Sequence, residues 1–171
     1  MDPKVLILMG SDSDWEVMSE AKKALDEMSI ATEVHVSSAH RTPERTGRLA
    51  REAAGRGVQV IVCGAGAAAH LAGVCAAETE LPVLGVPLAA SDLKGLDALL
   101  STAQMPAGVP VGTLAIGKPG ARNAGLLAAR IVARADPAVA AKVREQRARM
   151  AKEVEAKDAA LQSKISAAER P

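Results

Sequence analysis

The sequence predicts an α/β protein built on an open, parallel, five-stranded sheet. Short apolar runs alternate along the chain with amphipathic segments of helix length, and short turns join them. This alternation favours βαβ units with right-handed crossovers. The length of 171 residues, 49% of them apolar, fits a single domain with a substantial core. Five strands suit an open sheet better than a closed barrel.

Continuous apolar runs identify the strands. The first run, Val5 to Met9, is closed by Gly10, which is typical of a strand buried on both faces. The other predicted strands cover residues 32–36, 58–63, 83–86 and 111–116.

Apolar residues at spacings of three and four identify the helices between these strands. One such segment follows the polar turn at 11–14 and continues to about Ser29. Pro43 opens the next helix, because proline is favoured in the first helical turn. The remaining helices are predicted at 68–79, 94–103 and 121–134.

A long final helix is predicted from Pro137 to about Lys164. Its apolar residues recur in pairs every eleven residues, so the stripe that they form stays nearly straight along one face. We interpret it as the packing arm of a homo-oligomer in preference to a helix that binds a different partner. The chain thus divides into an αβα domain at 1–135 and a helical extension at 136–171, which packs on the domain or on a neighbouring subunit.

Composition excludes several classes of partner. The 21 basic and 20 acidic residues give a net charge of +1, without the positive cluster that nucleic-acid binding needs. With one Trp and no Tyr or Phe, side chains cannot form a stacking platform for bases. The apolar run near the N-terminus is too short for a signal-peptide core or a membrane span. We therefore expect a cytoplasmic protein that binds neither nucleic acid nor membrane.

The cysteines and histidines show no metal-ligand spacing. Cys63 and Cys75 are too far apart in sequence for a Cys-x-x-Cys motif, and the three histidines are scattered. We expect no metal site, and two reduced thiols that pack in the core.

Three loops at the predicted carboxyl ends of strands, residues 10–14, 37–42 and 64–70, are the places to look for chemistry. In the first, the N–H groups at a helix start attract anions. Asp14 would repel a phosphate, so it either caps the helix or accepts hydrogen bonds from sugar hydroxyls. Helix capping alone also explains this loop.

The second loop places His40 beside Arg41. The arginine fork suits phosphate, and histidine changes its charge near neutral pH, so the pair predicts phosphate binding beside an acid/base. A solvent-exposed polar turn is the alternative. In the third loop, small residues let the backbone approach a ligand, although Ala69 breaks the dinucleotide-binding glycine pattern. His70 either orients a ligand or packs in an Ala-rich helix.

Several motifs occur together and in a consistent order over about residues 4–135. They include Gly-Ser-Asp-Ser-Asp-Trp at 10–15, Ser-Ala-His-Arg-Thr-Pro at 38–43, Gly-Ala-Gly at 64–66 followed by His70 and Leu71, Leu-Gly-Val-Pro at 84–87, Gln-Met-Pro at 104–106 and Pro-Val-Gly-Thr-Leu-Ala-Ile at 110–116. With these motifs the chain resembles the N5-carboxyaminoimidazole ribonucleotide mutase family, the catalytic subunit of phosphoribosylaminoimidazole carboxylase in purine biosynthesis.

The resemblance implies a three-layer αβα flavodoxin-like (Rossmann-like) fold and a homo-octamer with sites at subunit contacts. It implies a shift of a carboxyl group from an exocyclic nitrogen to C4 of an imidazole, without a cofactor. On the family pattern His40 transfers the proton, and Ser11, Asp14 and Arg41 bind the ribonucleotide substrate. The expected substrate-binding set is completed by Ser13, Ser38, Ala39, Gly66, His70 and Leu71.

Two positions depart from the family pattern, because Ala67 stands where a further glycine is common and Ala72 where a proline is common. Both bear on the loop that lines the reacting ring. Two rival functions stay open. One is direct carboxylation of aminoimidazole ribonucleotide by free carbon dioxide, against which His70 and Arg41 favour the mutase. The other is a phosphoribosyl-binding module without catalysis.

Overall fold

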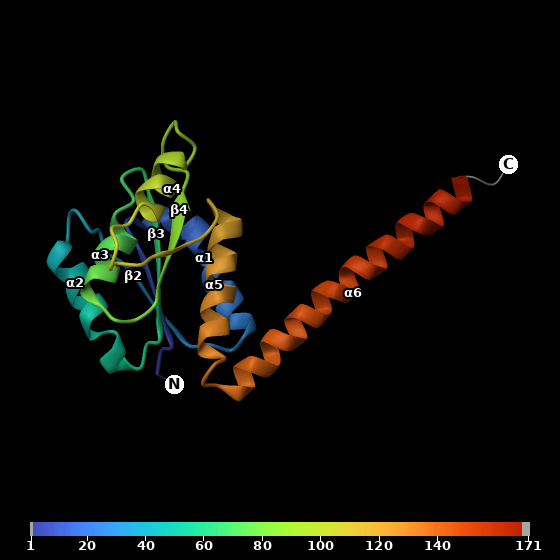
Figure 1. Ribbon diagram of the computed structural model, residues 1–171, viewed down its shortest axis with the longest axis horizontal. Coiled ribbons are helices and arrows are strands. Elements are labelled where there is room, and N and C mark those ends of the chain that lie inside the picture. Colours follow the sequence, from blue (N-terminus) through green and yellow to red (C-terminus); the bar gives the residue numbers. More distant parts are fainter. Residues whose placement is uncertain (1, 169–171) are drawn as a thin grey trace.

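A parallel five-stranded sheet forms the centre of the protein, in the order β2-β1-β3-β4-β5 (Figure 1). The computed structural model describes residues 2–168. The strands are β1 (Val5–Met9), β2 (Thr32–Val36), β3 (Val60–Gly66), β4 (Val83–Leu88) and β5 (Gly112–Thr113). The chain passes from β1 to β2 on one side and then returns across β1 to β3. The predicted α/β class and parallel sheet are confirmed.

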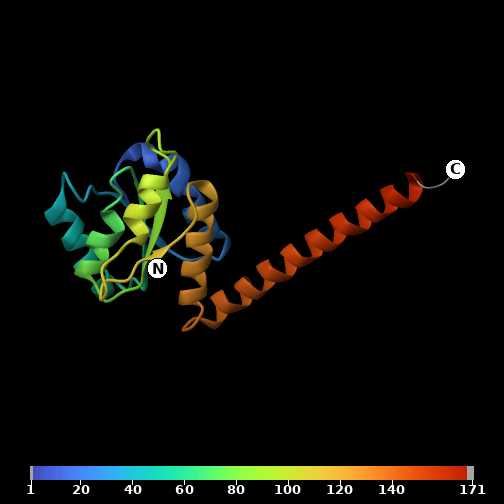
Figure 2. The same cartoon turned by 45° about the horizontal axis from the view of Figure 1, so that its top comes forward.

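Helices cover both faces of the sheet and make the fold three-layered (Figure 2). One face carries α1 (Trp15–Glu27) and α5 (Lys118–Val132). The other face carries α2 (Pro43–Glu52) and α3 (Leu71–Glu78), with α4 (Leu96–Ala103) beside α3 over β4. Two short 3-10 turns, η1 (Asp12–Asp14) and η2 (Ala54–Arg56), complete the domain.

Strand β1 supplies side chains to both halves of the core. Val5, Ile7 and Met9 pack with α1 and α5, whereas Leu6 and Leu8 pack with α2 and α3. All five residues are at most 2% exposed. This is why the strand reads as an unbroken apolar run, since a parallel sheet is covered on both faces.

Several boundaries differ from the predicted ones, among them those of β3, β5 and α3. Strand β3 begins at Val60 and continues to Gly66, beyond the predicted end at Cys63, because it stays paired with β4 as far as Leu88. Strand β5 keeps only two paired residues of the predicted 111–116. Helix α3 begins at Leu71 because the chain turns at Ala67, which has a φ of +51°.

The two cysteines lie in the core, as predicted. Cys63 on β3 and Cys75 on α3 are both free and at most 1% exposed. A hydrogen bond to Cys75, together with burial, raises the pKa of the Cys63 thiol well above its usual range. Cys63 therefore stays protonated and unreactive at neutral pH.

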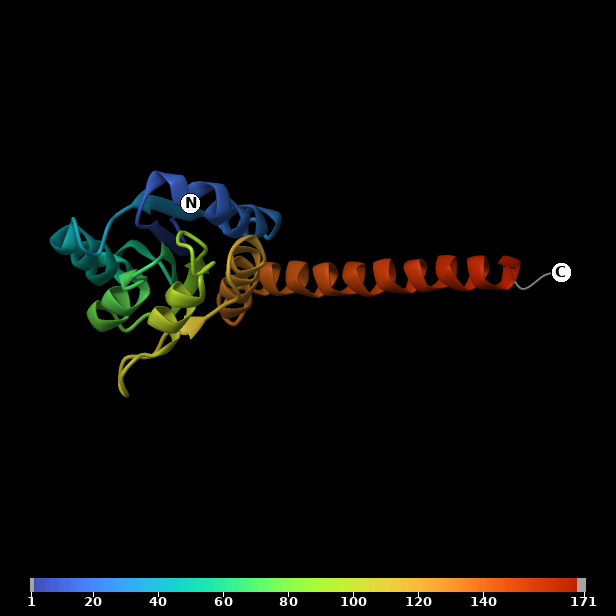
Figure 3. The same cartoon turned by 90° about the horizontal axis from the view of Figure 1, so that it is seen from above.

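Helix α6 (Pro137–Ala168) leaves the domain as a long arm (Figure 3). Its first turns pack against the body, where Val139 is buried and Arg149 lies 3.9 Å from Glu27 of α1. The apolar stripe beyond this point is exposed by 43–65%, so packing on the chain's own domain is limited to the helix start. The exposed stripe consists of Met150, Val154, Leu161 and Ile165.

The division into 1–135 and 136–171 stays a prediction, and residues 1 and 169–171 lie outside the described part. Between residues 2 and 168, no helix is long and apolar enough to cross a membrane.

The close approach of α1 and α5 yields a stability prediction. A Cβ added at Gly125 of α5 would lie 2.5 Å from the Ala21 carbonyl oxygen and 2.9 Å from Ala24 Cβ. We expect Gly125→Ala to lower the free energy of unfolding by about 1–3 kcal/mol in urea denaturation, because the helices must separate. Gly55→Ala is the control, since a Cβ there meets nothing within 4 Å. Equal losses in both variants would contradict this account.

Candidate functional site

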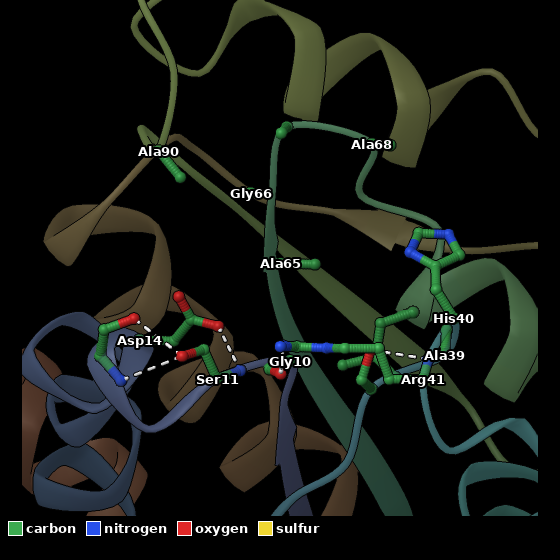
Figure 4. A pocket seen from close by; sticks show the side chains of 14 residues that line it. Gly10, Ser11, Asp14, Ala39, His40, Arg41, Ala65, Gly66, Ala68 and Ala90 are labelled. Atoms are coloured by element: carbon green, nitrogen blue, oxygen red, sulfur yellow. Dashed lines mark hydrogen bonds between the residues drawn. The ribbon is translucent and has the colours of Figure 1, made fainter.

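A cleft of about 510 Å³ opens at the carboxyl ends of β1, β2 and β3 (Figure 4). It lies where the strand order reverses around β1, the usual ligand position in open α/β sheets. Every predicted site residue except His70 lines it. These residues are Ser11, Ser13, Asp14, Ser38, Ala39, His40, Arg41, Gly66 and Leu71.

The loop after β1 is folded on itself as a helix cap. The Ser11 N–H donates to Asp14 Oδ2 at 3.0 Å, and the Ser13 N–H donates to Ser11 Oγ at 3.4 Å, a reciprocal capping box for η1. Burial raises the pKa of Asp14, while N–H groups of Ser11 and Gly10 act in the other direction. The expected capping by Asp14 is therefore confirmed only for η1, because at the N-cap of α1 its side chain makes no capping hydrogen bond. The N–H groups of Ser11 and Ser13 already have acceptors. Binding of an anion here therefore depends more on the serine hydroxyls and on nearby cations.

Arg41 joins the loops that follow β1 and β2. Its Nη2 donates to the Gly10 carbonyl at 3.1 Å, and its backbone N–H and Nε approach Ser38 Oγ at 3.2 and 3.5 Å. A guanidinium has five N–H donors, so several stay available to a ligand. The arrangement places a fixed cation in the wall of the cleft, well suited to phosphate.

The loop carrying His40 and Arg41 is rigid, which distinguishes it from a simple exposed turn. The Ser38 N–H donates to Thr42 Oγ1 at 3.0 Å, and that hydroxyl in turn donates to the Ser38 carbonyl at 3.0 Å. Beneath them the buried hydroxyls of Ser37 and Thr46 lie 2.8 Å apart. Hydrogen bonds thus fix the backbone on both sides of His40.

His40 and His70 form a hydrogen-bonded pair. His40 Nε2 lies 2.8 Å from His70 Nδ1, and the rings meet edge to face with centroids 5.0 Å apart. One nitrogen must donate and the other accept, so a pair with this bond carries at most one positive charge. His70 is exposed at the N-cap of α3 and contacts His40, which excludes the packing role in an Ala-rich helix.

The loop after β3 approaches the next loop very closely. A Cβ added at Gly66 would lie 2.4 Å from Ala90 Cβ, so glycine is required for this contact. Ala90 also lines the cleft, together with Ala65 and Ala68. No motif marks Ala90 in the sequence, although the segment after β4 also follows the carboxyl end of a strand.

The two departures from the family pattern lie in different places. Ala67 lines the cleft in a left-handed conformation, whereas Ala72 is buried and faces Gly85 of β4. Only Ala67 therefore borders the cleft directly. Across residues 2–168, no three His, Cys, Asp or Glu side chains are grouped in a way that could hold a metal ion.

The sequence profile of the AIR carboxylase family matches residues 4–153. The chain belongs to the AIR carboxylase family. A curated N5-carboxyaminoimidazole ribonucleotide mutase of Mycobacterium tuberculosis is 56% identical over 160 residues, which cover 94% of this chain and 91% of the relative. A protein of the same name from Bacillus subtilis is 54% identical, with 86% of this chain and 91% of the relative covered.

Two solved structures show the same fold. A substituted form of Treponema denticola PurE2 superposes with a TM-score of 0.85 at 26% identity, over 94% of this chain and 99% of that one. Treponema denticola PurE gives a TM-score of 0.83 at 27% identity, over 93% and 98%. Each superposition covers nearly all of both chains, so the expected three-layer flavodoxin-like architecture is confirmed.

The left-handed backbone at Ala67 yields a second stability prediction. Alanine in this region is disfavoured by about 1–2 kcal/mol, whereas glycine is not. We expect Ala67→Gly to raise the free energy of unfolding by about 1 kcal/mol in urea denaturation. Ala68→Gly, next to it in the same loop but without a positive φ, should lower stability. A loss in both variants would show that Ala67 is unstrained.

Proposed function

We propose that this AIR carboxylase family member is an N5-carboxyaminoimidazole ribonucleotide mutase. It converts N5-carboxyaminoimidazole ribonucleotide to 4-carboxyaminoimidazole ribonucleotide in purine biosynthesis, as an isomerase. The observation that carries the proposal is the paired histidine, His40, beside the fixed cation Arg41 in one cleft. Mutase relatives at 54–56% identity over most of the chain support it.

The cleft supplies separate places for the parts of the substrate. Arg41 and the hydroxyls of Ser11, Ser13 and Ser38 bind the phosphate, with neutral donors around one cation. Asp14 accepts hydrogen bonds from ribose hydroxyls, because a carboxylate would repel the phosphate. The heterocycle then lies near His40, against the apolar wall that is formed by Ala39, Gly66 and Leu71.

The reaction requires one proton to arrive and one to leave. When the bond between the exocyclic nitrogen and the carboxyl carbon breaks and carbon dioxide departs, the nitrogen takes a proton from His40. C4 then attacks carbon dioxide, a C–C bond forms, and the C4 proton goes to His40. The same imidazole acts first as acid and then as base, which closes the cycle.

His70 and the walls of the cleft assist this cycle. The 2.8 Å bond from His70 holds the His40 ring in one orientation, so that its other nitrogen faces a fixed direction. Carbon dioxide held beside C4 reacts again before it escapes, because proximity replaces a collision from solution.

The proposal extends to assembly and location. The exposed apolar stripe of α6 supports packing of the 136–171 extension on a neighbouring subunit, in a homo-octamer. Two free, buried thiols support residence in the reducing cytoplasm. The partner in catalysis is the small ribonucleotide alone, with no nucleic acid and no membrane.

The decisive experiment assays the two candidate substrates separately. The mutase is expected to convert N5-carboxyaminoimidazole ribonucleotide without added bicarbonate, and to leave aminoimidazole ribonucleotide largely unchanged with bicarbonate present. The reverse pattern identifies a direct carboxylase. Binding without any product on long incubation identifies a phosphoribosyl-binding module.

His40→Asn tests the acid/base role. General acid–base groups contribute about 100- to 10,000-fold, and we expect a loss at the upper end because His40 acts in both half-reactions. Substrate affinity, measured by calorimetry, should stay within about threefold, since the loop bonds of Ser38 and Thr42 remain. His35→Asn in β2 is the matched control, because His35 does not line the cleft. More than about a tenth of the wild-type rate in His40→Asn would assign proton transfer to another group.

Trp15 provides a direct test of ligand in the first loop. It is the only tryptophan, is 40% exposed, and directly follows Asp14. We expect its fluorescence emission to change when the ribonucleotide or inorganic phosphate binds, and Arg41→Ala to abolish the response to phosphate. No change in the wild type at saturating ligand would contradict binding at this loop.

A further inference from the structure

The loop that joins β4 to α4, residues 89–95, forms one wall of the cleft. Its Ala90 lines the cleft and lies on the other side from His40 in the view of Figure 4. Ala90 Cβ occupies the space beside Gly66, where an added Cβ would be only 2.4 Å away. The position of this loop therefore sets the width of the cleft at Gly66.

A side-chain bond between the loop and the first turn of α4 fixes this position. Ser91 Oγ donates to Asp97 Oδ2 at 2.6 Å and accepts from the Leu93 N–H at 3.2 Å. The Lys94 N–H donates to the Ser91 carbonyl at 3.0 Å. Ser91 is thus the point at which the loop closes on itself and is bound to the helix. We call the Ser91–Asp97 contact the loop brace.

The carboxylate of Asp97 is half-buried beside this contact. Its Oδ1 is shielded from solvent and has no hydrogen-bond partner within the described chain. The Ser91 hydroxyl lowers the pKa of Asp97, so the group is ionised at neutral pH and the brace is a charge-assisted bond.

The backbone of the loop also needs restraint. Lys94 has a φ of +51° and precedes Gly95 at +87°, so a residue with a side chain stands in the left-handed region. Such strain persists only where surrounding contacts impose it. Leu93, at the exposed end of the loop, is 62% exposed and gives little packing to hold the loop in place. The Leu96 N–H also donates to the Leu93 carbonyl at 3.0 Å, and Gly95 is buried close to Ile116. The brace adds a side-chain hydrogen bond from the loop to α4.

We infer that Ser91 and Asp97 are positioning residues, whose bond holds Ala90 against Gly66 and so keeps the cleft at the width that the ribonucleotide needs. The inference rests on the proposed function for its effect on the substrate. The restraint of the loop itself does not depend on that function.

Cleavage by trypsin after Lys94, an exposed residue of the loop, measures the brace without any assay of activity. Ser91→Ala is expected to speed cleavage at Lys94 roughly tenfold, as expected for the loss of one hydrogen bond to a charged group. Ser91→Thr keeps the hydroxyl and should restore the wild-type rate. Asp97→Asn, which keeps the size but removes the charge, should give an intermediate rate.

Ser101→Ala is the matched control for these variants. Ser101 is also a half-buried serine next to Asp97, but its hydroxyl donates to the Asp97 carbonyl at 2.8 Å within α4. Its loss should leave cleavage at Lys94 unchanged.

Kinetics supply the second measurement. Ser91→Ala is expected to raise KM about five- to tenfold with kcat within about twofold, because a misplaced wall weakens binding of the ground state and transition state alike. Unchanged cleavage at Lys94 in Ser91→Ala overturns the brace. Faster cleavage with an unchanged KM overturns its role in positioning. An inactive wild type with faster cleavage in Ser91→Ala overturns the proposed function and leaves the brace in place.

Discussion

Strand β1 bonds to β2 on one side and to β3 on the other, and its side chains fill both halves of the core. Because all three strands run in parallel, their carboxyl ends lie at one edge of the sheet. The loops that follow them are therefore neighbours. Only a chain that returns across β1 after β2 produces this edge. The cleft therefore follows from the order of the strands, and the residues in the loops decide what it binds.

Within that edge, polar contacts between loops replace the bulky side chains that many binding sites use. The chain has no Tyr or Phe, and the cleft walls are mostly glycine, alanine and serine, with Asp14, His40, Arg41 and Leu71 among them. Arg41 reaches the carbonyl of Gly10, thirty-one residues away in sequence, and His40 reaches His70 across thirty. Each bond ties two loops together, so the groups that would hold phosphate and move a proton are also the groups that hold the site in shape.

The sequence predicted β1 and β2 to the residue. The unbroken apolar run of β1 indicates a strand covered on both faces, whereas β2 alternates polar and apolar residues at the edge of the sheet. The sequence overestimated β5, since the apolar run at 111–116 says nothing about how long β4 remains beside it. The motifs identified the residues that line the cleft, but not the bond between His40 and His70. That contact depends on where α3 begins, and the left-handed turn at Ala67 sets this start. Alanine rarely adopts a left-handed conformation, so the sequence does not predict the turn. The direction of α6 could not be predicted either. An apolar stripe has the same sequence pattern whether it packs on its own domain or on another subunit.

Three residues other than glycine adopt a positive φ in the described chain, and their distribution is informative. Ser29 ends α1 far from the cleft, where a left-handed residue is a common way to finish a helix. Ala67 and Lys94, by contrast, lie in the two loops whose contact at Gly66 and Ala90 bounds the cleft. Backbone strain concentrates where surrounding structure imposes a conformation that the local sequence does not favour. Here the imposed conformation brings His70 to His40 on one side and Ala90 to Gly66 on the other. The strain in both loops thus follows from the small residues that line a narrow cleft. Their side chains are too short to bound it unless the backbones of the two loops approach each other.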